Sequence, residues 1–166
     1  MDKIKIIMFL FVSSTLVACQ SYDKKTDNII FRPRWWLEVD LKNKSIYIEV
    51  SKERTKLDLT EKEEDLIIKS FEKNDIGELK GEYHVSGKDV ITPIIDFMFT
   101  VKRKDKRVLD VSVNKNYVTQ PNSKSLEDRL ARFRDDVNAV LQSNMSYKKA
   151  EKKLDDYIDK NNVIVM

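Results

Sequence analysis

The chain has 166 residues, of which 36% are charged, and its formal net charge is +3. Lys and Arg alternate with Asp and Glu along most of the chain, which argues against nucleic-acid binding because that function usually needs a concentrated basic face. The one cysteine excludes an internal disulfide, and the one histidine, His84, excludes a zinc site built from several histidines. We therefore expect no metal, no cofactor and no nucleic-acid partner.

The first residues have the features of a secretory signal. Asp2, Lys3 and Lys5 form a short charged start, and residues 6–12 form an apolar run. From residue 6 to residue 18 the segment is too short, and too interrupted by polar residues, to form a comfortable membrane-spanning helix. It ends in the sequence Leu16-Val17-Ala18-Cys19.

These four residues resemble the lipobox of bacterial lipoproteins. The resemblance implies that a diacylglycerol is attached to the Cys19 sulfur, that the signal is cut just before this residue, and that the new amino terminus is often acylated. Gln20 stands where some bacteria read aspartate as an inner-membrane retention signal. The expected location is therefore the outer membrane, facing the periplasm.

We divide the chain into a signal peptide (1–18), a lipidated tether (19–32) and a single domain (33–166). The tether is mostly polar and, if fully extended, reaches on the order of 45 Å. Residues 35–41 alternate apolar and polar as a half-buried strand does, and residues 45–50 return with Ile46 and Ile48 on one face. In this hairpin Trp35 points inward, whereas Trp36 points outward on the side of Tyr47.

A capping box of Thr60 and Glu63 predicts a helix, with Leu66, Ile67, Ser70 and Phe71 on its inner side. The only three glycines, at positions 77, 81 and 87, predict turns around a short strand at 82–85. Residues 94–101 and 109–113 form two strands joined by a basic turn at 102–107. We interpret this as a solvated turn, and the alternative is a contact with anionic lipid headgroups or an acidic partner.

Two helices follow, one opened by Ser125 and one beginning after Ser146. Phe133 lies on the inner side of the first, whereas Arg134 lies on an outer side, so Arg134→Ala should cost little stability. The inner positions of the second are Tyr147, Ala150, Leu154 and Ile158. Residues 163–166 end the chain as a short apolar segment.

The element order ββα, two or three strands, then αα predicts an α+β fold. We expect an antiparallel sheet of about four to five strands with the helices packed on one face.

The sequence holds no recognisable catalytic set, so we expect a protein that is not an enzyme. His84 has no nucleophile motif beside it, and the acid pairs on the predicted helices are typical of solvated ion-pair partners. An exposed aromatic residue beside charged neighbours is a common protein-contact anchor, which makes Trp36 and Tyr47 candidate partner-binding residues. The alternative is that another segment covers Trp36.

Three functions remain open. The first is a lipid-anchored envelope protein that binds a protein partner, in its sharpest form an immunity protein or inhibitor against a secreted toxin. The second is a structural or assembly accessory of an envelope complex. The third is a hydrolase whose site the sequence does not reveal.

Overall fold

The computed structural model describes residues 21–86, 96–120 and 122–163. Cys19, the signal-like segment, Gly87 and the apolar end at 164–166 lie outside the described residues. The described strands form one seven-stranded sheet in the order β4-β3-β2-β1-β6-β7-β5. Their bounds are β1 (Asp27–Arg34), β2 (Leu37–Asp40), β3 (Ser45–Ile48), β4 (Glu53–Lys56), β5 (Gly81–Val85), β6 (Asp96–Arg103) and β7 (Lys106–Asn114).

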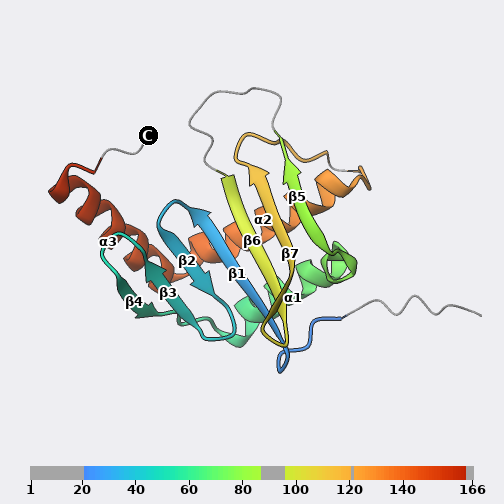
Figure 1. Cartoon of the computed structure of the whole chain (residues 1–166), viewed down its shortest axis with the longest axis horizontal. Coiled ribbons are helices and arrows are strands. Elements are labelled where there is room, and N and C mark those ends of the chain that lie inside the picture. The colour runs from blue at the N-terminus through green and yellow to red at the C-terminus, as the bar shows by residue number, and fades with distance from the viewer. Residues whose placement is uncertain (1–20, 87–95, 121, 164–166) are drawn as a thin grey trace, which may run out of the picture.

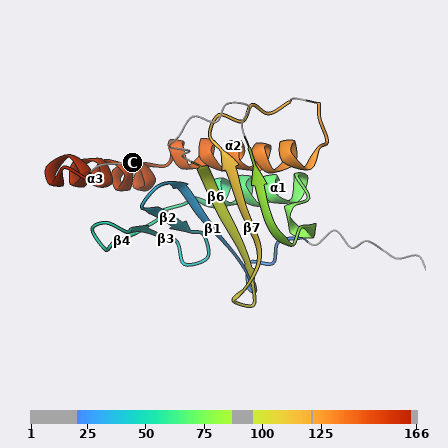
Figure 2. The same cartoon turned by 45° about the horizontal axis from the view of Figure 1, so that its top comes forward.

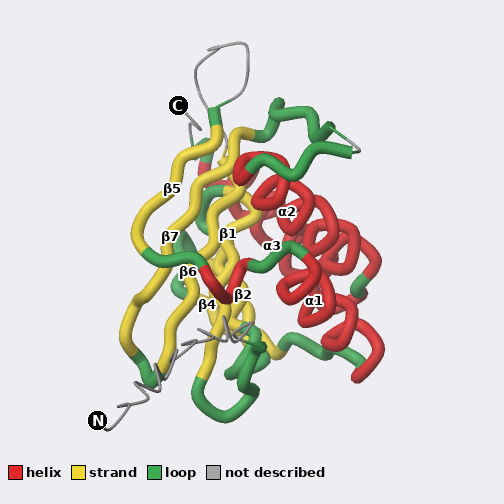
Figure 3. The backbone as a smooth tube through the Cα atoms, turned by 90° about the vertical axis from the view of Figure 1, so that its right-hand side faces the viewer, coloured by secondary structure: helices red, strands yellow, loops and turns green. Residues whose placement is uncertain are grey.

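All the described helices cover the same face of the sheet, as the side view in Figure 3 and the tilted view in Figure 2 show. They are α1 (Glu61–Lys73), α2 (Leu126–Ser143) and α3 (Met145–Asn161), with a short 3₁₀ turn at Ile76–Glu78. The predicted capping box is confirmed, because the Glu63 amide donates to the Thr60 hydroxyl (3.2 Å) and the Thr60 amide donates to the Glu63 carboxylate (2.8 Å).

The strands are connected as two groups. Strands β1 to β4 form an antiparallel meander in chain order, and α1 then leads to β5 at the opposite edge. The predicted β6–β7 hairpin is confirmed and lies between β1 and β5, antiparallel to β1 and with β5 parallel to β7. The α+β class is thus confirmed, but the sheet is mixed and has more strands than expected.

An aromatic cluster joins the sheet to the helices at the centre of the core. The Phe133 ring of α2 contacts Phe31 of β1 at 6.1 Å, Phe71 of α1 at 5.9 Å and Phe99 of β6 at 5.0 Å between ring centroids. All four side chains are buried. This cluster fixes which face of β1 and β6 turns toward the helices, because side chains alternate along a strand.

The prediction of a spacer as far as residue 32 is wrong, because residues 27–32 belong to β1, a central strand. Ile29 and Phe31 are completely buried. The strand tolerates Pro33 because its register with β2 shifts between Phe31 and Arg34, and such an irregularity removes the need for a ladder N–H.

Two predicted orientations on the helices are also wrong. Leu66 is 48% exposed, since the buried positions of α1 are Ile67, Ser70 and Phe71. Arg134 is buried, and its guanidinium donates to the carbonyls of Asn114 (2.7 Å) and Tyr117 (3.0 Å). The expectation that Arg134→Ala costs little therefore no longer holds, because the change would leave both carbonyls without their charged donor.

Candidate functional site

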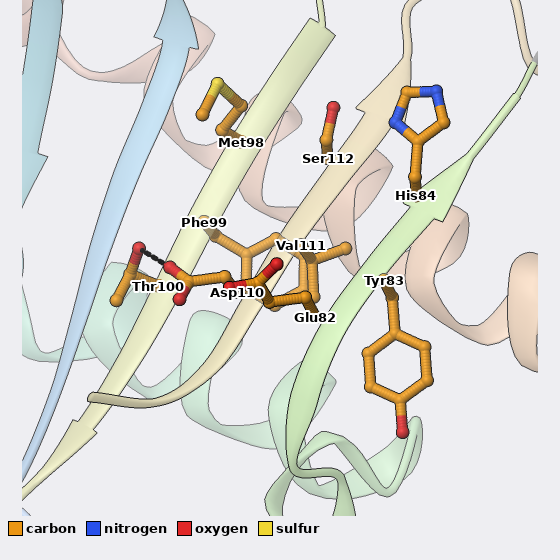
Figure 4. Close-up of a pocket in the computed structure, with 9 residues that line it drawn as sticks. All are labelled: Glu82, Tyr83, His84, Met98, Phe99, Thr100, Asp110, Val111 and Ser112. Atoms are coloured by element: carbon orange, nitrogen blue, oxygen red, sulfur yellow. Dashed lines mark hydrogen bonds between the residues drawn. The ribbon is translucent and has the colours of Figure 1, made fainter.

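One face of the sheet is not covered by any described element, and we call it the open sheet face (Figure 1). Phe99, Val111 and Tyr83 point toward the helices, so the residues next to them on each strand point outward, as Figure 4 shows for β5, β6 and β7. The open sheet face is thus built entirely from strand residues whose positions are fixed by the core behind them.

The outward side chains form two rows across the strands. The first row runs Arg54, Tyr47, Glu38, Arg32, Met98, Ser112 and His84. The second runs Lys56, Ser45, Asp40, Ile30, Thr100, Asp110 and Glu82. Both rows mix acids, bases and apolar groups, so the face can offer complementary charge and apolar contact to one partner.

Ion pairs hold several of these side chains in place. The Arg32 guanidinium donates to the Glu38 carboxylate at 2.8 Å. The Asp110 carboxylate accepts from the Thr100 hydroxyl at 2.7 Å and pairs with the Arg107 guanidinium at 3.3 Å. Their orientation is therefore set before any partner arrives, which lowers the entropy lost on binding.

Met98 lies where three hollows of this face meet. It is 42% exposed, and it lines one hollow of about 290 Å³ toward β5, a second of about 290 Å³ toward β2 and a third of about 210 Å³ toward the β1–β2 turn. The first hollow is drawn in Figure 4. The sequence analysis did not select Met98, although its position was readable. Alternation buries Phe97 and Phe99, so the apolar Met98 between them must point to the otherwise polar face of the strand.

Trp35 and Trp36 do not continue the strand as predicted but form the two-residue turn between β1 and β2, which we call the tryptophan turn. Both side chains are half-buried, their rings meet edge to face at 6.1 Å, and the Trp36 carbonyl accepts from the Glu49 amide at 2.9 Å. The expectation of one inward and one outward ring fails because alternation does not hold within a turn. Both rings line the third hollow together with Met98.

Tyr47 lies elsewhere on the same face. This residue belongs to β3 and pairs with Glu38 of β2. The Arg54 guanidinium lies 5.3 Å from the centre of the Tyr47 ring. The structure thus places the two predicted contact residues on one continuous surface, but it does not pair them: Trp36 stacks on Trp35, whereas Tyr47 lies under Arg54.

His84, Ser112 and Asp110 share the hollow of Figure 4, so we compare them with a hydrolytic triad. In a triad the carboxylate orients the histidine, whereas the Asp110 carboxylate accepts from the Thr100 hydroxyl and pairs with the Arg107 guanidinium. Strand β7 is paired on both sides, with β6 and with β5, whereas β5 is the edge strand of the sheet.

Two further features bear on metal ions and membranes. Within the described residues no group of three or more His, Cys, Asp and Glu side chains is placed to hold a metal ion. None of the described helices combines the length and the apolar character that crossing a membrane requires.

Comparison of the chain with protein-family models, with curated proteins and with solved structures gave no match.

Proposed function

We propose that this protein is a lipid-anchored protein of the bacterial cell envelope that acts by stoichiometric binding of a protein partner. The anchor is acylated Cys19, and the contact surface is the open sheet face with the tryptophan turn. One observation carries the proposal: an uncovered sheet face has an exposed methionine that lines three hollows, beside the Arg32–Glu38 and Arg107–Asp110 ion pairs.

The surface fits a protein better than a small ligand. Its three hollows open to solvent, and the residues that line them come from several strands. Apolar groups at the centre with charged groups around them are the usual anatomy of a protein–protein contact. Flexible methionine and rigid tryptophan supply the apolar anchors, and the Arg32–Glu38 and Arg107–Asp110 pairs supply the polar rim.

The test compares Met98→Asp with Leu66→Asp in the full chain. Both residues are large, apolar and about equally exposed, but Met98 lies on the open sheet face and Leu66 on α1. The partner is first identified by crosslinking in the envelope fraction and then purified for titration. We expect Met98→Asp to weaken binding by roughly 30-fold or more, as for a hot-spot residue, and Leu66→Asp to bind like wild type. Equal effects of the two changes would contradict the proposal.

The sharpest form of this function is an immunity protein or inhibitor that neutralises a secreted toxin. Cells without the protein would then be killed by toxin-producing siblings, and wild-type protein would rescue them where Met98→Asp would not. The alternative, an accessory of an envelope complex, predicts an envelope defect in single cultures instead.

A further inference from the structure

The domain holds its own chain close to the point where the anchor would begin. The Tyr22 ring packs edge-on against Phe71 at 5.6 Å, and its hydroxyl donates to the Asp27 carbonyl at 3.2 Å. The Asp27 amide donates to the Asp23 carbonyl at 2.8 Å. Only residues 20 and 21 separate Tyr22 from Cys19, a distance of about 10 Å at full extension. An acyl group on Cys19 would thus hold the domain against the bilayer.

Two turns of the sheet meet this first segment at the same end of the molecule (Figure 1). The Lys104 amide of the β6–β7 turn donates to the Thr26 carbonyl at 2.8 Å. The Lys42 amide of the β2–β3 turn donates to the Asn28 side chain at 3.1 Å. Three segments distant in sequence therefore form one end surface.

This end surface is rich in lysine, and we call it the basic end. Its lysines are Lys25, Lys42, Lys102, Lys104 and Lys106, of which all but the half-buried Lys102 are exposed. Among the described residues, none of these five makes an ion pair.

Neighbouring charges at this end are largely matched. Arg103 pairs with Asp27 at 3.6 Å, and Lys24 and Lys44 pair with Glu64 at 3.5 and 3.0 Å. Within two residues of the five lysines in the sequence, the exposed acids are Asp23 and Asp105, and the exposed Asp65 pairs with Lys24 at 3.7 Å. The basic end therefore keeps a net positive charge where the chain would meet the membrane.

We propose that the basic end is a second membrane contact, which binds anionic phospholipid headgroups and orients the lipid-anchored domain. The inference rests on the proposed anchoring at Cys19. A lipid anchor and a group of lysines act together on a membrane because each lysine near an anionic surface adds to the attraction. In this orientation β1 runs away from the bilayer, and its eight residues carry the tryptophan turn about 25 Å outward.

The test uses the acylated full chain in vesicles, with acylation of Cys19 first verified by mass spectrometry. Because Cys19 is the only cysteine, Asn43→Cys provides a single labelling site at the basic end, and Glu49→Cys provides one at the far end of β3. A headgroup-bound quencher reports how close each dye lies to the bilayer. Vesicles of phosphatidylcholine are compared with vesicles that also contain phosphatidylglycerol.

We expect stronger quenching at residue 43 in the anionic vesicles, and little at residue 49 in either. The triple change Lys42→Glu, Lys104→Glu and Lys106→Glu should abolish the difference, and added salt should reduce it. Equal quenching at residue 43 in both vesicles, or closer approach of residue 49, would overturn the inference. An unmodified Cys19 would overturn the anchor instead, and sedimentation of the full chain with the same vesicles would then decide whether the basic end binds them.

Discussion

Trp36 adopts a backbone conformation that bulky residues seldom adopt. Its φ is 63°, in the left-handed region, where an L-residue with a side chain pays about 1–2 kcal/mol. The strain persists because the hairpin and the Glu49 amide fix the turn on both sides. Such strain is concentrated at functional sites, and here it holds both tryptophan rings beside Met98.

Comparing Trp36→Gly with Trp36→Ala separates the backbone cost from the loss of the ring. Both changes remove the ring, but glycine adopts a positive φ freely, so the glycine variant should be about 1 kcal/mol more stable than the alanine variant. Urea unfolding of both proteins measures the difference. Trp35, which carries no positive φ, should show no such gain from glycine. Equal stability of the two Trp36 variants would mean that the turn relaxes once the ring is gone.

Asp128 makes the stability of the α2 start depend on pH. Its buried carboxylate accepts from the Gln120 amide (2.8 Å) and from the hydroxyls of Ser125 (2.8 Å) and Tyr117 (3.2 Å). These hydrogen bonds, that from the Gln120 amide most of all, lower the pKa of Asp128 from 3.8 to about 2. The folded-state pKa is depressed, so the stabilisation is present above pH 3.8 and is lost as the pH falls through about 2.

We therefore expect Asp128→Asn to flatten the loss of stability on acidification within this window. Urea unfolding at a series of pH values, for wild type and variant, provides the measurement. The exposed Asp156→Asn is the matched control and should follow the wild-type profile. A variant that loses stability as steeply as wild type would show that other groups control the acid transition.

At the scale of the elements, α2 is the helix that packs against both the β1–β4 meander and the β6–β7 hairpin. Through Phe133 it contacts β1 from the first group and β6 from the hairpin, and also α1. We expect Phe133→Ala to cost about 3–5 kcal/mol, because the cavity would open between all of these elements. Phe133→Leu should cost less, and Val118→Ala, at a residue that is 75% exposed, should cost under about 0.5 kcal/mol. A thermal melt of Phe133→Ala that matches wild type would contradict this account of the core.

The sequence predicted the elements with a clear periodicity and missed those without one. The β6–β7 hairpin and all the described α-helices were predicted because their buried residues recur at strand or helix spacing. Strand β1 was missed because Ile29-Ile30-Phe31 is a continuous apolar run without alternation and Pro33 follows two residues later. Strand β4 has no apolar residue: its Arg54 lies over Tyr47 on the open sheet face, and its Glu53 pairs with Lys153 of α3.

The candidate site was predictable only in part, for the same reason. Trp36 and Tyr47 were chosen from strand alternation, and alternation holds for Tyr47 but not within the tryptophan turn. The hollows around Met98 depend on β1 lying beside β6, a pairing between residues about seventy positions apart such as Ile29 and Val101. No local pattern in the sequence carries that information.

At the scale of the whole molecule, our proposal gives stable attachment to the acyl chains on Cys19, with the basic end as a weaker second contact, and it gives neither a part in folding. We expect Cys19→Ser to abolish membrane retention and leave the domain folded, because the basic end alone binds reversibly. Palmitate incorporation and detergent partitioning measure the first effect, and the thermal melt measures the second. Unchanged palmitate labelling of the variant would refute lipidation at this residue.

The order of the strands means that the sheet is completed late in folding. The first part of the chain supplies both β1 and β5, and the β6–β7 hairpin from the later part fits between them. Before the hairpin pairs with them, β1 and β5 are separated by the width of two strands. The unpaired edge of the apolar strand β1 is then prone to pair with other chains. A backbone cut between residues 86 and 96 would leave each piece with edges that only the other piece satisfies. The nicked protein should therefore stay assembled as a pair of complementing fragments, and neither fragment should be soluble alone.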